Sequence, residues 1–368
     1  MDKKISFAGP WITQKEIDIV TDAVENGWYE DHMKYTKKLE KEISSYIGVQ
    51  YALATHCCTH ALHLAVASLG LKKGDEVIVP DHSWVATAYA IAYTGATCVF
   101  VDIEQDTLCI DPTAIEKAIT PNTKAIMVVH NFGIPVEMDK ILEIAEQHNL
   151  KIIEDAAPAL GAEYKDKKIG SWGDVACFSF QGGKAVVSGE GGILVTNDEE
   201  TYKRALLLAT MGRTDRVAPF WSDEIGYQYT MPNLTASLAL CQFERIDELI
   251  AKKREIHAWY YQLLANHPKV RFVKEKKDMR STYCYPALFL SKQSITPRDE
   301  IIKNLRNKNI HCRPGFPRMS EFPVFHSERR FSNEVAEEFE KHGLVLPSAA
   351  NLSRKDAETV VEILESFL

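Results

Sequence analysis

Short apolar segments alternate with helix-like segments along the first half of the chain, and this alternation constrains the fold more than any other feature. Between about residues 50 and 200 the apolar segments read "QYALAT", "DEVIVPD", "ATCVFVDI", "KAIMVVHNFG" and "LKIIEDAAPAL". The first four are each followed by a stretch with helical spacing, such as "THALHLAVASLG" or "MDKILEIAEQHN". Continuous apolar strands joined by helices predict an α/β fold with a mostly parallel sheet that is covered on both faces.

The pattern changes after residue 174. "DVACFSF" and "ILVTND" read as two strands separated by the glycine-rich loop "QGGKAVVSGEGG", with no helix between them. Residues 234–267 then have the apolar spacing of one long helix, and Asn233 precedes them as a possible N-cap. We therefore predict a large domain over residues 1–250 that ends in this bridging helix. A smaller C-terminal α+β domain is predicted over residues 251–368.

Charge and composition exclude several classes of partner. The formal net charge is −8, whereas non-specific nucleic-acid binding needs clustered Lys and Arg, so we expect no nucleic-acid partner. No run of about 18 apolar residues and no N-terminal apolar h-region is visible, which argues against a membrane span and a secretory signal. The eight cysteines are scattered without a CxxC pair. Buried thiols in a cytoplasmic protein are the expectation.

Four places in the sequence are predicted to share one edge of the sheet, because ligands bind outside the carboxyl ends of strands in open α/β folds. They are residues 56–59, 81–84, 155 and 179–184, and each follows an apolar strand.

Two residues at this edge carry alternative interpretations. Asp155 either caps a following helix or holds the protonated ring nitrogen of a bound heterocycle, since an ionised carboxylate at the end of a buried strand is costly unless it is paired. Lys184 is either a solvated loop lysine or a desolvated amine competent to form a Schiff base. Its position between a strongly apolar strand and "AVV" favours the second interpretation.

Two nucleotide-binding interpretations of the loop around Lys184 fail on spacing. A Walker loop needs Ser or Thr directly after the lysine, but Ala185 stands there. A dinucleotide fingerprint would open a helix, but "GEGG" is followed by a strand. An acid, the aromatic Trp84, a hydroxyl donor and a buried amine together meet the needs of pyridoxal 5′-phosphate.

At these residues the sequence resembles the DegT/DnrJ/EryC1/StrS family of pyridoxal phosphate-dependent sugar aminotransferases. The resemblance runs nearly end to end and is carried by "EVIVPDHSWVATAYAI", "FVDIEQDTLCIDPTAIEKAIT", "IIEDAAPALGAEYKDKKIGSWGDVACFSF" and "KAVVSGEGGILVTND". It implies the fold-type-I transferase architecture. It also implies a ping-pong reaction in which glutamate or glutamine converts the cofactor to pyridoxamine 5′-phosphate, which then aminates a nucleotide-linked keto-deoxy sugar for surface polysaccharide synthesis.

The resemblance also implies a role for each matching residue. Lys184 would form the internal aldimine and move protons, Asp155 would bind the ring nitrogen, and Trp84 would stack on the ring. The remaining residues implied for the phosphate and the substrate are Cys58, Thr59, Ser179, Gln228, Arg313 and Arg318. Gln228 in "GYQYTM" would reach the phosphate site of the neighbouring subunit, so the family implies a homodimer with shared active sites. Arg313 and Arg318 would clamp the substrate's pyrophosphate, or form surface salt bridges instead.

Three departures from the family pattern concern the site. Pro158 replaces the usual Gln after "DAA", Cys58 stands in place of the glycine of the phosphate turn, and Thr230 replaces an Arg. None removes essential chemistry, but each affects the substrate side. The same chemistry on a cyclitol or another non-nucleotide keto sugar is the enzymatic alternative. A non-catalytic or zinc-binding protein of the same fold is the alternative from another class.

The zinc alternative arises from "HCCTHALH", where five potential ligands lie within eight positions. Structural zinc sites normally draw four ligands from two separated clusters, and the sequence contains no second cluster of suitable spacing. The turn also leads from a strand into a helix, and helix N-termini favour anions. We therefore predict no metal site and expect the turn to bind phosphate, with the Cys58 side chain directed away from it.

Overall fold

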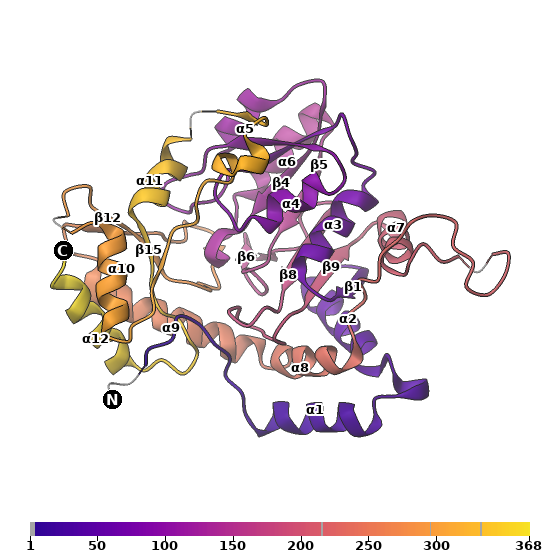
Figure 1. The fold of residues 1–368 in the computed structure, drawn as a ribbon, viewed down its shortest axis with the longest axis horizontal. Coiled ribbons are helices and arrows are strands. Elements are labelled where there is room, and N and C mark those ends of the chain that lie inside the picture. Colours follow the sequence, from indigo (N-terminus) through magenta and orange to yellow (C-terminus); the bar gives the residue numbers. More distant parts are fainter. Residues whose placement is uncertain (1–3, 215, 295, 332) are drawn as a thin grey trace.

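A computed structural model describes residues 4–214, 216–294, 296–331 and 333–368 (Figure 1). Within these ranges, eight strands form one large sheet. In spatial order they are β1 (Tyr51–Thr55), β9 (Gly192–Thr196), β8 (Val175–Ser179), β5 (Lys151–Asp155), β4 (Thr123–Val129), β2 (Glu76–Pro80), β3 (Thr97–Val101) and β14 (Arg329–Arg330).

The large sheet is mostly parallel, which confirms the predicted fold class. The five strands β8, β5, β4, β2 and β3 run parallel to one another, and β9 runs antiparallel to both β1 and β8. The loop between β8 and β9 therefore starts and ends at the same edge of the sheet. The short strand β14 comes from the C-terminal part of the chain and adds to this sheet, with Arg329 opposite Val99.

Helices cover both faces of the large sheet, because strand residues alternate between two apolar clusters. In β2, Val77 and Val79 pack with one cluster and Ile78 packs with the other. The first face carries α3 (Cys58–Ser68), α4 (Ala86–Ala92) and α7 (Glu199–Ala209). The second face carries α2 (Lys34–Ile47), α5 (Pro112–Ala118), α6 (Met138–His148) and α8 (Asn233–Phe243), with α1 (Gln14–Asn26) packed on α8.

The prediction of one continuous helix after Asn233 is wrong. The chain forms α8 and then α9 (Ile246–Leu264), with a break at Glu244 and Arg245. Arg245 has φ −112° and ψ 17°, and its guanidinium pairs with Glu16 of α1 at 2.6 Å. The apolar spacing continues across the break, so periodicity alone does not reveal it.

Asn233 is also not an N-cap. It is the first residue of α8, and Pro232 takes the cap position. Its side chain accepts a hydrogen bond from the Tyr35 amide at 2.8 Å and donates to the carbonyls of Gly27 and Asp31. Asn233 thus fixes the connection between α1 and α2 against the start of α8.

A second, antiparallel sheet lies at the other end of α9. It contains β10 (Val270–Phe272), β12 (Ala287–Leu290), β15 (Gly343–Val345) and β13 (Arg313–Pro314). Its core is shared with α9, α10 (Arg298–Asn307) and α12 (Arg354–Glu365), while α11 (Glu334–His342) precedes β15. Ile5 joins this core and forms a parallel bridge to Ile310. The domain boundary at residue 250 falls inside α9 and stays a prediction.

Smaller elements complete the description. Strands β6 (Glu163–Tyr164), β7 (Lys167–Lys168) and β11 (Met279–Arg280) form a three-stranded sheet. Short 3₁₀ helices occur at Tyr29–Asp31, Asn131–Gly133, Met319–Glu321 and Pro323–Phe325. Figure 1 shows the four-stranded sheet with β12 and β15 at the left of the molecule, and the segment after α7 projecting at the right. Of the helices in the described ranges, none combines the length and the apolar character needed to cross a bilayer.

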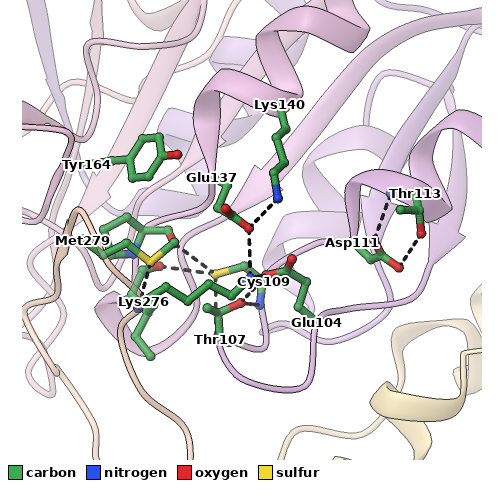
Figure 2. A network of polar contacts seen from close by, with 12 residues as sticks. Glu104, Thr107, Cys109, Asp111, Thr113, Glu137, Lys140, Tyr164, Lys276 and Met279 are labelled. Atoms are coloured by element: carbon green, nitrogen blue, oxygen red, sulfur yellow. Dashed lines mark hydrogen bonds and ion pairs between the residues drawn. The ribbon is translucent and has the colours of Figure 1, made fainter.

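A polar network ties the segment before β11 to the large sheet (Figure 2). The Lys276 ammonium lies 2.7 Å from Glu104 and 2.9 Å from Glu137, and its backbone amide contacts the Met279 sulfur at 3.4 Å. Glu137 also pairs with Lys140 at the start of α6. These contacts hold residues 274–285 against the body that carries the parallel strands.

Candidate active site

A cavity of about 360 Å³ opens at the carboxyl edge of the parallel strands. Seven of the residues that the sequence nominates line it together: Cys58, Thr59, Trp84, Asp155, Ser179, Lys184 and Arg313. They come from segments that are far apart in the sequence, and the parallel arrangement brings the strand ends among them to one edge. Pro158, the departure that follows the strand of Asp155, also lines the cavity.

Asp155 is the last residue of β5 and is 4% exposed. Its carboxylate accepts a hydrogen bond of 2.7 Å from the Thr87 hydroxyl and one of 3.2 Å from the Ala157 amide. Burial raises the pKa of Asp155 above its ordinary value, while the Thr87 and Ala157 bonds and the charge of Lys184 act in the opposite direction. A cation placed against this carboxylate would offset the cost of its burial.

Thr87 is a site residue that sequence reasoning missed. It lies in the first turn of α4 and is fully buried, and its hydroxyl also contacts that of Ser83 at 2.8 Å. The single Thr87 proton has two acceptors within reach, the Asp155 carboxylate at 2.7 Å and the Trp84 carbonyl at 3.0 Å. With this proton donated to Asp155, the shorter contact, Ser83 is the donor to Thr87. The only sequence signal is that Thr87 follows Trp84 by three positions, within reach of the same edge.

Lys184 stands in the loop between β8 and β9 and is half-buried. Its amide donates to the Gln181 carbonyl at 2.9 Å, and the Gln181 side chain accepts from the Gly183 amide at 2.9 Å. The Lys184 ammonium lies 5.7 Å from the centroid of the Tyr285 ring. This turn places the amine at the cavity that Asp155 also lines.

The turn at the start of α3 forms another wall of the cavity. Cys57 is the N-cap in extended conformation, with φ −158° and ψ 164°, and Cys58 is the first helical residue. The first amides of a helix have no partner within it, so Cys58 and Thr59 present a natural anion site. Ser179, at the end of β8, lines the same cavity and is 6% exposed.

Cys58 fits beside the cavity because its side chain packs into an apolar cluster that also contains Leu62 and Cys177. Burial raises the pKa of the Cys58 thiol well above its ordinary value, so the side chain is a neutral core group. Close packing also requires a glycine at position 192, next to this turn. A Cβ on Gly192 would lie 2.5 Å from the Cys57 carbonyl carbon and from the Cys58 amide nitrogen.

Two aromatic rings face the cavity from opposite parts of the chain. Trp84 is 64% exposed, and its ring centroid lies 6.0 Å from that of Phe316. Phe316 in turn stacks on Phe132 at 6.0 Å, with an interplanar angle of 12°. The Trp84 indole is therefore free to stack on a planar ligand while Phe316 supports one of its edges.

The two arginines nominated for substrate binding are placed differently. Arg313 lines the cavity, with its guanidinium 4.3 Å from the centroid of Phe7. Arg318 is not among the lining residues; its Nε pairs with Glu340 at 2.8 Å, and Glu337 lies within 3.7 Å. Of these two arginines, only Arg313 is therefore placed to bind a substrate in this cavity.

Gln228 lies outside the cavity of its own chain. It is exposed, and its amide contacts the Thr230 hydroxyl at 3.4 Å. It follows the segment that projects after α7 in Figure 1. Its contribution to a neighbouring subunit stays a prediction.

The histidines of the "HCCTHALH" stretch pack against aromatic rings. His60 stacks on Tyr229 at 3.8 Å with parallel planes, and His63 lies 4.8 Å from the Tyr227 ring. Burial lowers the pKa of both histidines. Across the part of the chain that the structure describes, no group of three or more His, Cys, Asp or Glu side chains is arranged to hold a metal ion.

Comparison with known proteins agrees with this geometry. GDP-perosamine synthase of Escherichia coli O157:H7 is 38% identical over 365 residues, covering 99% of both chains, and that of Caulobacter vibrioides is 38% identical over 367 residues, covering 99% and 98%. The solved PLP form of a putative sugar aminotransferase, Spr1654 from Streptococcus pneumoniae, superposes over 100% of both chains with a TM-score of 0.92 and 27% identity. Residues 10–365 match the model of the DegT/DnrJ/EryC1/StrS aminotransferase family. The chain belongs to the DegT/DnrJ/EryC1/StrS aminotransferase family.

Proposed function

We propose that this aminotransferase moves an amino group from glutamate or glutamine to the keto group of a nucleotide-linked keto-deoxy sugar, with pyridoxal phosphate as its cofactor. The observation that carries the proposal is the convergence of Asp155, Lys184 and the N-terminus of α3 on one cavity. The relatives named GDP-perosamine synthase support a sugar nucleotide as the acceptor, with GDP as the first nucleotide to test.

The residues present fit the cofactor. Asp155 is a buried carboxylate with two hydrogen-bond donors and room for a cationic partner at the cavity. The amides of Cys58 and Thr59 and the hydroxyl of Ser179 suit a phosphate group. Bound pyridoxal phosphate supplies an electron sink that stabilises negative charge at the carbon next to the substrate nitrogen.

The remaining chemistry belongs to the chain itself. The Lys184 amine would hold the cofactor and would serve as the acid–base that carries a proton between carbon atoms. Asp155 would bind the ring nitrogen and favour its protonated form, which supports the electron sink. The Trp84 indole would pack on the ring and exclude water from it.

Arg313 is the proposed anchor for the anionic part of the substrates. Among the described residues it forms no ion pair, and its guanidinium stays at the cavity through its contact with Phe7. A guanidinium binds carboxylate and phosphate in a bidentate manner. We expect Arg313 to bind the pyrophosphate of the sugar nucleotide.

The assembly and the cellular role are part of the same proposal. A homodimer with Gln228 reaching the phosphate of the partner's site would complete the cavity, and a cytoplasmic location would give access to activated sugars. The product would enter surface polysaccharide, in line with a relative named as a spore coat polysaccharide biosynthesis protein.

A half-reaction screen tests the proposal. The protein, converted with glutamate to the pyridoxamine form, is mixed with keto-deoxy sugars linked to GDP, UDP or dTDP and with nucleotide-free keto sugars and cyclitols. Return of the visible absorbance band with a nucleotide-linked sugar supports the proposal. Return only with a nucleotide-free ketone overturns the assignment of the acceptor. A colourless protein that stays inert with added pyridoxal phosphate overturns the whole function.

A further inference from the structure

A second lysine is buried beside the cavity. Lys253 lies on α9, is 2% exposed, and is among the largest fully buried side chains of the described residues. Its ammonium lies 5.6 Å from the centroid of the Tyr285 ring, and the Lys184 ammonium lies 5.7 Å from the same centroid. One aromatic ring therefore contacts two lysines, of which only Lys184 has a role so far.

The hydrogen bonds around Lys253 identify it as a cation. Its ammonium donates to the Ser348 carbonyl at 2.8 Å and to the Ser348 hydroxyl oxygen at 3.3 Å, and the Tyr285 ring offers a third acceptor. The Ser348 hydroxyl donates its own proton to the Cys284 carbonyl at 2.9 Å. An ammonium has three donors and no acceptor, which these three partners match, whereas the lone pair of a neutral amine would need a donor.

The same contacts connect Lys253 to the loop of Lys184. A Cβ on Gly183 would lie 2.4 Å from the Tyr285 hydroxyl, so this hydroxyl packs directly on the residue before Lys184. The Cys284 thiol also reaches the Gly183 carbonyl at 3.9 Å. Phe7 stacks on Tyr285 at 5.1 Å. Tyr285 is thus held between Lys253, Phe7 and the lysine loop.

We propose that Lys253 acts as a buried positive charge that holds the Tyr285 ring against the Lys184 loop and favours the uncharged, nucleophilic form of the Lys184 amine. Like charges that share a low-dielectric environment disfavour each other's charged form. Desolvation lowers the pKa of Lys253, and the charge of Lys184 acts in the same direction. Lys253 is a positioning residue, because it acts on Lys184 through space and through Tyr285.

Other titratable groups face the Lys184 amine or its loop. Those that line the same cavity or contact this loop are Cys57, Cys58, Asp155, Glu190, Cys284, Tyr285 and Arg313. Asp155 and Glu190 are the acids of this environment, and Arg313 and Lys253 are its cations. Lys253 is the cation among these groups that is closed off from solvent, so its effect is the least screened by salt.

The experiment measures how readily Lys184 is methylated by formaldehyde and cyanoborohydride as a function of pH, with the Lys184 peptide followed by mass spectrometry. The full-length protein is stripped of cofactor for this measurement. In Lys253→Met the midpoint of Lys184 labelling should rise by about one pH unit, the order of magnitude for one unit charge that acts across an aromatic ring at an intermediate dielectric. Lys253→Arg keeps the charge and should keep the midpoint near that of the wild type.

Lys252→Met is the matched control. Lys252 is the neighbouring residue on α9, pairs with Glu255 and contacts Trp259 rather than Tyr285, so its loss should leave the midpoint unchanged. A folded Lys253→Met protein with an unchanged midpoint overturns the proposal, even if it is less stable. If Lys253→Met does not fold, Ser348→Ala removes one acceptor of the ammonium. In Ser348→Ala the midpoint of Lys184 labelling should rise by a smaller amount than in Lys253→Met. An unchanged midpoint in Ser348→Ala would also overturn the proposal.

A second readout uses the cofactor-loaded chain and rests on the proposed function. The visible absorbance of bound pyridoxal phosphate is titrated with pH, and its midpoint should move in the same direction as the methylation midpoint. A wild-type chain that binds no pyridoxal phosphate refutes the proposed function, while the methylation experiment still decides the role of Lys253.

Discussion

The Thr87 hydroxyl donates a 2.7 Å hydrogen bond to the Asp155 carboxylate, and both groups are buried. Thr87 lies on α4 and Asp155 at the end of β5, so the bond joins two separate segments at the cavity. Both residues line the cavity, so the bond restrains the Asp155 carboxylate at the place where a ligand would meet it. The strength of cofactor binding should therefore depend on Thr87, a residue to which the family resemblance assigned no role.

Replacing Thr87 by Val, which has the same shape without the hydroxyl, should weaken cofactor binding about tenfold. The Asp155 carboxylate loses a donor, so its pKa rises further and less of it is ionised to hold the ring nitrogen. The dissociation constant of pyridoxal phosphate, measured by absorbance titration at pH 7.5, checks this. Thr87→Ser retains the hydroxyl and should stay within about twofold of the wild type. Equal affinity of the Val and Ser variants would falsify the role of the bond.

Gly192→Ala should damage the phosphate turn. The added Cβ would meet the backbone of Cys57 and Cys58 at 2.5 Å, so the first turn of α3 must shift. We expect a loss of about 1–3 kcal/mol in the free energy of unfolding and at least a tenfold loss of affinity for pyridoxal phosphate. Gly182→Ala is the control in the neighbouring loop, because the nearest atom to its Cβ is 3.8 Å away. A Gly192→Ala protein with native affinity would contradict the placement of the phosphate at this turn.

Substitution of Arg313 and substitution of Arg318 should have different effects on the steady-state kinetics. Arg313→Ala should raise KM for the sugar nucleotide tenfold or more, because the side chain lines the cavity and pairs with no carboxylate of the described residues. Arg318→Ala should leave KM within about twofold and cost roughly 1 kcal/mol of stability through its lost pair with Glu340. Steady-state kinetics with chemical denaturation provides both numbers. A KM effect in Arg318→Ala that exceeds the one in Arg313→Ala would reverse the assignment.

Glu40 on α2 should make stability fall as pH rises towards neutrality. Burial raises its pKa from 4.5 to about 7, although its carboxylate accepts a 2.8 Å bond from the Ala54 amide. Below about pH 4.5 the group is protonated in both states and carries no penalty; the penalty grows as pH rises and is complete above about pH 7, because only the unfolded state ionises freely. Glu40→Gln should remove roughly 2 kcal/mol of this dependence.

Urea unfolding of the Glu40→Gln protein at pH 5 and pH 8 measures the effect. The variant should exceed the wild type in stability at pH 8 and approach it at pH 5. Glu42→Gln, an exposed position on the same helix, is the matched control and should show the wild-type difference between the two pH values. A wild-type protein with no loss of stability over this range argues against a neutral, buried Glu40.

The rule that ligands bind at the carboxyl ends of parallel strands explains how much of the site could be predicted from the sequence. Cys58, Trp84, Asp155 and Ser179 each follow an apolar strand, and parallel strands bring their carboxyl ends together. Their positions in the sequence therefore predicted that they lie at one cavity, and their chemical roles stay a prediction. The parallel sheet could also be predicted, because the alternation of strands and helices depends on local periodicity alone.

Contacts between distant segments could not be predicted in this way. The break before α9 depends on Arg245 meeting Glu16 of α1, and no local pattern records that contact. Strand β14 is a pair of arginines that reads as loop. Lys253 reads as one of several lysines on an amphipathic helix, and only the folded chain shows that it is buried against Tyr285.

The antiparallel pairing of β8 with β9 has a consequence for the order of folding. These strands are neighbours in the chain as well as in the sheet, so the hairpin that carries Lys184 closes through short-range contacts. Asp155 is added to this hairpin when β5 pairs in parallel with β8. Tyr285 belongs to a segment about 100 residues further along the chain. We therefore expect the Lys184 hairpin to form before the more distant parts of the site are in place. Added pyridoxal phosphate should therefore slow unfolding of the finished protein and leave its refolding rate almost unchanged.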